Sequence, residues 1–295
     1  MPFGPPVAPP PDPAQPAQSW SPVGIPAGRP VGPSLRRVLR ASSAARLRAV
    51  AEDLRRVAQP VTTCRRIVVG GVGNGAGATT LAALLGLAFA THRRDLTLAV
   101  DASAGGGSLA YRLGDVPAWS HQDLASLAGQ LDVNQAGQTV RSRGQLSVLP
   151  HLPGTAIDDY WTVSAALTRF CAVSVVDGGV SAPGGIGYPG GAHAMVLAIP
   201  ATMDSVRTAL AWFAGAPPQV RCRAVPVLVG DVSAGGLRRT ATVRALGVEV
   251  PAACLPYDHG LAAAAPVRPR RLRQQTVDAT LQVAGTALAL ACGAR

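Results

Sequence analysis

The sequence contains no lysine: all 27 basic residues of the 295-residue chain are arginines, and the formal net charge is +11. No lysine from elsewhere in the chain can therefore occupy a phosphate-binding position. An arginine could take that place, but its guanidinium is bulkier and planar and would have to approach a phosphate from another direction.

Paired cysteines and long apolar runs are also missing. The five cysteines are odd in number and form no Cys-x-x-Cys pair, which predicts buried free thiols rather than disulfides or a metal site. The histidines are isolated from one another and from the cysteines, which argues against metal or thiol catalysis. Arg, Asp, Gly or Pro interrupts every apolar run of about 18 residues, and the N-terminal residues lack the basic-then-apolar order that is typical of a signal peptide. We therefore expect a soluble cytoplasmic protein, and a peripheral position at the inner face of the membrane stays open.

The first 62 residues divide into two segments of different composition. Residues 1–33 hold twelve prolines, which predicts a disordered, partly polyproline-II tail that is either a passive tether or a docking segment. Residues 34–62 are predicted to form a basic helical linker. Its helix would contact an anionic membrane, nucleic acid, or its own domain. The apolar positions at helical spacing are Leu35, Val38, Leu39, Leu47, Val50, Leu54 and Val57, and the basic face carries Arg36, Arg37, Arg40, Arg46, Arg48, Arg55 and Arg56.

A phosphate-binding loop is predicted at residues 66–90, where a β-branched run leads into the glycine-rich stretch VGNGAGATT and then a helix that starts near Thr79. The glycines let the backbone turn tightly with its N–H groups pointing inward. The phosphate-binding loop motif ends in Gly-Lys-Ser/Thr, whereas this chain has Gly77-Ala78-Thr79, followed by Thr80. The motif lysine is missing.

Alternating strands and helices follow, so residues 63–295 are predicted to form one α/β domain with a doubly wound, mostly parallel sheet. Asp101 and Asp177 each end a predicted strand, and Asp177 is suitable for holding the water shell of a magnesium ion. The predicted strands are Leu96–Val100, Leu146–Leu149, Ala172–Val176, Ala194–Ile199, Ala224–Val229 and Val248–Ala252, and the predicted helices are Leu124–Leu131, Ser205–Phe213, Gly236–Leu246 and Thr276–Cys292. The segment LPYDHGLA, residues 255–262, is expected at the carboxyl edge of the sheet.

Four segments in this order resemble the MinD/ParA group of P-loop ATPases from about Arg65 to the C-terminus: VGNGAGATT, VDASAGGGSLAYRLG, VVDGG and LPYDHGLA. The chain is similar in particular to bacterial MinD-like proteins associated with type VII secretion, which also have a proline-rich tail and a basic linker. The CpaE-like pilus-assembly group is a second branch that looks similar. The resemblance implies ATP or ADP with magnesium as cofactor.

The resemblance also implies roles for individual residues. The two family lysines fall at Gly73 and Ala78, the water-orienting aspartate at Ser103, and the adenine-reading asparagine near Gly230, next to Asp231. Thr79 and Asp177 match the magnesium ligands, and Asp101 matches a second aspartate, which leaves Asp101 and Asp177 as the catalytic candidates. The nucleotide-binding candidates are Gly73, Asn74, Gly75, Ala76, Gly77, Ala78, Thr79, Thr80, Pro256 and Asp258.

Three functions are compatible with this pattern. The first is a degenerate ATPase that acts as a regulatory or scaffolding partner in secretion, envelope assembly or positioning, alone or as a homodimer. The second is a working ATPase in which arginine replaces lysine, with Arg65, Arg66, Arg93 and Arg94 as the nearest candidates in sequence. The third is a DNA-associated partition protein that binds through the basic helix.

Overall fold

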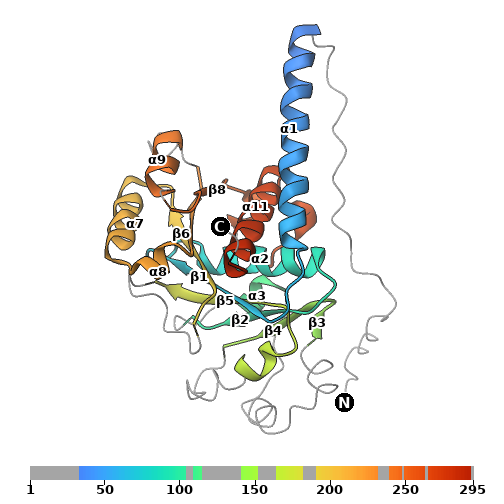
Figure 1. Cartoon of the computed structure of the whole chain (residues 1–295), viewed down its shortest axis with the longest axis vertical. Coiled ribbons are helices and arrows are strands. Elements are labelled where there is room, and N and C mark those ends of the chain that lie inside the picture. The colour runs from blue at the N-terminus through green and yellow to red at the C-terminus, as the bar shows by residue number, and fades with distance from the viewer. Residues whose placement is uncertain are drawn as a thin grey trace, which may run out of the picture.

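The computed structural model describes residues 33–103, 109–114, 141–151, 164–181, 191–231, 239–247, 249–262 and 265–293 (Figure 1). The predicted proline-rich tail up to residue 32 and the predicted helix Leu124–Leu131 lie outside these ranges. Within them the predicted alternation of strands and helices is confirmed.

One eight-stranded sheet forms the centre of the molecule. Seven strands are parallel, and the edge strand β3 pairs antiparallel with β4. The strands, in spatial order, are β3 (Arg141–Arg143), β4 (Leu146–Leu149), β2 (Thr97–Asp101), β5 (Val173–Val180), β1 (Arg65–Gly71), β6 (Ala194–Pro200), β7 (Ala224–Val229) and β8 (Ala253–Leu255). The central strands β1, β5 and β2 therefore bring their carboxyl ends together at one edge.

Helices cover both faces of this sheet, as expected for a doubly wound fold. Successive residues of β6 show the two faces: Val196 and Ala198 belong to the core shared with α2 and α11, whereas Leu197 and Ile199 pack with residues of α7. The helices are α1 (Pro33–Val57), α2 (Ala78–His92), α3 (Leu109–Arg112), α7 (Met203–Gly215), α8 (Pro218–Arg221), α9 (Arg239–Leu246), α10 (His259–Ala262), the short 3₁₀ turn η1 (Pro269–Arg271) and α11 (Gln274–Ala291).

Two strand predictions were wrong in position. Val248–Ala252 does not form the last strand, which is Ala253–Leu255; Pro251, which has no N–H for a ladder, lies inside the predicted segment. β5 does not end before Asp177 but continues to Val180, because Gly71 of β1 still pairs with Val180 after a register shift. Asp177 therefore lies inside the sheet rather than just beyond it.

All five cysteines are free thiols, as predicted, but the expected burial is confirmed only for Cys171, because the other four are half-buried. α11 contributes buried residues along most of its length and packs in the core, again as predicted. In the part of the chain that the structure describes, no helix is both long enough and apolar enough to cross a membrane.

The basic helix α1 stands beside α11 (Figure 1), and its second half packs on the domain. The two helices approach closely at Gly285, where an added Cβ would lie 3.1 Å from the Asp53 carbonyl oxygen. Val57 is completely buried, whereas Leu47, predicted on the apolar face, is 69% exposed. Arg46 Nε donates a 2.6 Å hydrogen bond to Asp278 on α11. Of the three predicted surroundings for this helix, its own domain is confirmed for this half.

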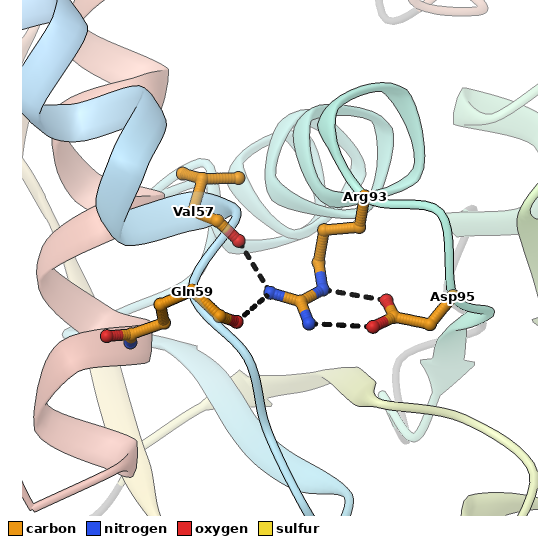
Figure 2. A network of polar contacts seen from close by, with 4 residues as sticks. All are labelled: Val57, Gln59, Arg93 and Asp95. Carbon is orange, nitrogen blue, oxygen red and sulfur yellow. Dashed lines mark hydrogen bonds and ion pairs between the residues drawn. The ribbon is translucent and has the colours of Figure 1, made fainter.

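A buried arginine fastens the end of α1 to the end of α2 (Figure 2). Arg93 follows the last residue of α2 and donates from Nη1 to the carbonyl oxygens of Val57 and Gln59 at 2.6 and 2.9 Å. Its Nε and Nη2 donate to the two carboxylate oxygens of Asp95, both at 2.8 Å. The guanidinium thereby satisfies carbonyls at the negative end of α1 and holds the linker against the domain.

We expect Arg93→Met to lower the free energy of unfolding by about 2–4 kcal/mol, because methionine keeps an apolar stem but leaves two carbonyls and one carboxylate without their donor. Urea unfolding followed by circular dichroism measures the change. Arg94→Met, at the exposed neighbouring position, is the matched control and should shift stability by less than about 0.5 kcal/mol. Equal stability of the two variants would contradict this account of α1.

Candidate phosphate-binding site

The glycine-rich loop joins the end of β1 to the start of α2 at the carboxyl edge of the sheet. Val72 N–H donates to Ala198 of β6 at 3.1 Å, and Ala76 N–H donates to the Gly73 carbonyl at 3.3 Å, which closes a tight turn. Gly75 and Gly77 have φ angles of +72° and +90°, a region that favours glycine. The predicted turn is therefore built by residues that can adopt it.

This loop presents free N–H donors on an open side. Among the described residues, the backbone N–H groups of Asn74, Gly75 and Gly77 meet no hydrogen-bond acceptor. A Cβ added at Gly73 or Gly75 would meet no atom within 4 Å, so space is open there. The first turn of α2 adds its own N–H groups and has no side-chain cap at Gly77. The arrangement is suited to hold an anion.

Two buried carboxyl groups lie beside the loop on neighbouring strands, where Asp101 of β2 pairs with Asp177 of β5. Burial, and then the Asp177 carboxylate, raise the pKa of Asp101 to about 6. Burial also raises the pKa of Asp177, and the Thr79 hydroxyl and the Gly179 N–H partly counteract this rise. The structure thus brings together Thr79, Asp101 and Asp177, which the sequence separates by nearly a hundred residues.

One oxygen of Asp177 is left for another partner. Its Oδ1 accepts the Gly179 N–H at 3.2 Å, whereas its buried Oδ2 has no hydrogen-bond partner of good geometry in the described ranges. A buried carboxylate oxygen without a partner is costly unless a cation or donor completes it. With the Thr79 hydroxyl nearby, Asp177 fits the hard oxygen ligands that Mg²⁺ prefers.

Ser103 and the Gly178–Gly179 stretch meet at the same edge. A Cβ added at Gly179, which has a φ of +66°, would lie 3.1 Å from the Ser103 hydroxyl oxygen. The Ala102 N–H donates to the Asp177 carbonyl at 2.9 Å. Ser103 therefore lies beside the strand end that carries Asp177, but a serine offers no carboxylate at this position.

The LPYD segment does end β8 at the carboxyl edge, but its aspartate has a structural partner set. Asp258 accepts hydrogen bonds from the Thr276 hydroxyl at 2.6 Å and from the N–H groups of Arg273 and Gly260 at 2.8 and 2.9 Å. Burial alone would raise the pKa of Asp258, but these hydrogen bonds outweigh it, and the pKa is lowered. Asp258 thus fixes the start of α11.

A groove of about 980 Å³ lies between α1, α11 and the ends of β7 and β8. One side is lined by Gly230, the position implied for the adenine-reading residue, and its neighbour Asp231, together with the nucleotide-binding candidate Pro256 and the adjacent Tyr257. No residue of the 73–80 loop lines it. The structure therefore places Pro256 and Gly230 together, but on a hollow that the phosphate loop does not border.

The four arginines predicted to replace the lysine lie at the wrong edge. Arg65 and Arg66 begin β1, about 20 Å of strand away from the loop, and Arg93 and Arg94 follow the far end of α2, about 22 Å from its start. Arg66 donates to the Gly191 carbonyl, and Arg93 holds α1. These residues cannot reach a phosphate on the loop.

The arginine that does reach the loop helix is Arg112, which sequence reasoning missed. Its Nη2 donates to the Thr80 hydroxyl at 2.5 Å, and its side chain is almost fully buried. Its position in the segment VDASAGGGSLAYRLG was the only sequence signal, since nothing in the local pattern shows which way the side chain points.

Together these features define the class of protein: an α/β protein with a P-loop at the carboxyl edge of a parallel sheet. Solved ParA and MinD ATPases are similar in structure. A ParA family ATPase from Chlorobium tepidum TLS matches with a TM-score of 0.61 and 17% identity, over 75% of this chain and 98% of that one. The MinC:MinD cell division protein complex from Aquifex aeolicus matches with a TM-score of 0.57 and 18% identity, over 74% and 95%.

A third similar structure is the septum site-determining protein MinD complexed with Mg-ADP from Pyrococcus horikoshii OT3, with a TM-score of 0.52 and 17% identity over 75% of this chain and 94% of that one. No family model and no curated protein matches the sequence. The comparisons show that the chain has the MinD/ParA type of P-loop ATPase fold.

The raised pKa of Asp101 predicts a stability that depends on pH. The folded protein holds this proton more tightly than the unfolded chain, so the contribution is fully present below about pH 4 and is lost as the pH rises through about 6. We expect Asp101→Asn, which can still accept the Leu109 N–H, to remove this loss. Relative to wild type, the variant should gain up to about 3 kcal/mol between pH 4 and pH 7.

The measurement is urea unfolding of both proteins across this pH range, in a chelator that removes divalent cations. Stability curves that run parallel from pH 4 to pH 7 would show that the Asp101 carboxyl has an ordinary environment.

Proposed function

We propose that this protein binds ATP or ADP with Mg²⁺ at the 73–80 loop, has weak or lost hydrolysis, and acts as a regulatory or scaffolding partner. The observation that carries the proposal is the combination of a preformed, open N–H cradle with the complete absence of lysine. The cradle supports binding, and the missing cations argue against turnover.

The loss of cations is expected to cost less in phosphate binding than in ATP hydrolysis. One charge-assisted hydrogen bond contributes about 1.5–3 kcal/mol, so loss of one lysine weakens phosphate binding by roughly ten- to a hundredfold while the N–H groups remain. Phosphoryl transfer depends on positioning and charge neutralisation, and a missing cation from a partner subunit costs about a thousandfold or more. With Gly73, Ala78 and Ser103 at the positions implied for two lysines and an aspartate, binding survives these losses better than hydrolysis does.

Thr79 and Asp177 are the residues proposed to hold magnesium, directly or through its water shell. The bound ion would neutralise phosphate charge next to the loop. The proposal draws support from the uncompleted Oδ2 of Asp177 and from the similar MinD structure, which is described as complexed with Mg-ADP.

We also propose scaffolding by protein contact. A similar structure holds MinD in a MinC:MinD complex, so the fold is compatible with a protein partner. We propose a cytoplasmic protein, or one peripheral at the inner face of the membrane, that serves a secretion or envelope-assembly machine of the type VII kind as monomer or homodimer. The N-terminal tail and α1 are the proposed contact elements.

The exposed arginines of α1 favour one alternative, which is DNA or anionic-membrane contact. Arg48 and Arg55 are exposed on the side of α1 away from the core, and the chain carries a net charge of +11. Steep weakening of DNA binding with added salt, reduced by Arg36→Ala, Arg37→Ala and Arg40→Ala together, would support it. The other alternative, an active ATPase with arginine in place of lysine, loses its four original candidates, which lie at the opposite edge of the sheet.

Calorimetry with ATP, ADP and a nonhydrolysable ATP analogue, each with and without Mg²⁺, tests the proposed function. We expect all three to bind, with Mg²⁺ strengthening the binding of wild type but not of Asp177→Asn. Gly77→Val should weaken all three at least tenfold, because the residue has a φ of +90° and an added Cβ would lie 3.3 Å from Val229.

A turnover assay on the same samples separates a binding protein from an enzyme. We expect no magnesium-dependent release of phosphate above that of Asp177→Ala. Steady ATP turnover that Asp177→Ala abolishes would refute the proposal that hydrolysis is weak or lost. Absence of any nucleotide binding at millimolar concentration would refute the proposed function altogether.

A further inference from the structure

Arg112 is a buried charge without an acidic partner among the described residues. Its Nη1 donates to the Ala265 carbonyl at 2.7 Å, and its Nη2 donates to the Leu261 carbonyl at 3.1 Å and to the Thr80 hydroxyl at 2.5 Å. All three acceptors are neutral. The residue is only 3% exposed, and burial lowers the pKa of its guanidinium from the usual value.

Such a charge is expensive to maintain unless an anion approaches it. A buried guanidinium usually pairs with a carboxylate, because neutral acceptors do not repay the loss of hydration fully. Arg93 in the same protein shows the usual solution, with both oxygens of Asp95 as partners. Within the described ranges no carboxylate pairs with Arg112, so its guanidinium is available to interact with an external anion.

The fold places the open N–H cradle next to this charge. Thr80, which accepts the Arg112 hydrogen bond, is the third residue of α2 and lies directly after Ala78 and Thr79 at the positive end of that helix. The backbone carbonyl of Arg112 also accepts the Val267 N–H at 2.7 Å. Its guanidinium is thus held at the first turn of α2 by hydrogen bonds to Thr80, Leu261 and Ala265.

We propose that Arg112, held at the first turn of α2, supplies positive charge in place of the missing lysine and makes binding at the loop depend on the negative charge of the ligand. It does so without touching the phosphate, through the low-dielectric interior between its guanidinium and the first turn of α2. This inference rests on the proposed phosphate binding at the 73–80 loop. Arg112 is therefore a positioning and charge-supplying residue, and its role goes beyond the proposed nucleotide binding.

The test compares ligands that differ in charge. Affinities for adenosine, AMP, ADP, ATP and inorganic pyrophosphate are measured by calorimetry, without Mg²⁺ and at fixed ionic strength, for wild type, Arg112→Met and Arg112→Lys. A purely structural role of Arg112 would weaken all five ligands by one common factor. A charge role weakens them in order of charge, by about threefold to tenfold for each additional negative charge, and spares adenosine.

We expect Arg112→Met to reduce the ATP-to-AMP affinity ratio by about ten- to a hundredfold and Arg112→Lys to restore most of it. Arg207→Met, on the exposed face of α7, removes the same net charge at a distance and should leave the ratio unchanged. Should Arg112→Met lose its cooperative unfolding transition, Arg112→Gln is the second neutral variant, since its amide can still donate to one of the carbonyls.

Four results would overturn the inference. Equal weakening of all five ligands in the neutral variant would make Arg112 a structural residue and leave the proposed function standing. An unchanged ATP-to-AMP ratio, or no recovery in a folded Arg112→Lys, would do the same. Failure of wild type to bind pyrophosphate and every nucleotide would instead remove the proposed function, and this inference with it.

Discussion

The placement of the positive end of α2 at the carboxyl edge of a parallel sheet is the constraint on which the site depends. β1 delivers the loop to that edge, and β5 and β2, its neighbours in the sheet, deliver Asp177 and Asp101 to the same place. Uncapped N–H groups, open space above Gly73 and Gly75, and a φ of +90° at Gly77 then leave a cradle that only an anion completes well. The cradle is formed by backbone N–H groups, so it is present even though Ala78 stands where the motif has lysine.

Loss of lysine changes where positive charge can come from. In this fold the arginines near the loop in sequence sit at the opposite edge of the sheet, because β1 and α2 each run the full depth of the domain. Arg112 reaches the loop helix instead, from the short helix α3, which lies within the segment VDASAGGGSLAYRLG. The two buried aspartates favour a cation instead. Burial raises the pKa of both Asp101 and Asp177, and a bound cation would stabilise their ionised carboxylates. The first turn of α2 thus lies near groups of both signs, with Thr80 bonded to Arg112 and Thr79 close to Asp177.

The same use of arginine shapes the region outside the sheet. Arg93 ties the carbonyl end of α1 to the end of α2 (Figure 2). Gly285 of α11 allows α1 to approach that helix closely. The segment predicted as a linker between tail and domain therefore contributes Val57 to the core. Any partner that binds the exposed side of α1 would contact an element fixed to the α/β domain.

Much of the fold and the core of the site were open to prediction from local pattern. The strand, glycine turn and helix around the loop, the parallel α/β order, and the meeting of Thr79 with Asp177 follow from residue type and spacing, because carboxyl ends of parallel strands share one edge. The local pattern did not predict where β5 ends or where β8 lies. A register shift against β1 extends β5, and Pro251 lies before the start of β8.

Local sequence indicates a glycine-rich loop without lysine between a strand and a helix, whereas the packing of distant segments places the charged side chains around it. Arg65 and Arg93 are near the loop in sequence and far from it in space, whereas Arg112 is distant in sequence and touches Thr80. Asp258 lies in the LPYD segment, but its carboxylate accepts hydrogen bonds at the start of α11. The physical reason is that backbone conformation is largely local, while the direction and partners of a long charged side chain depend on segments brought together by packing.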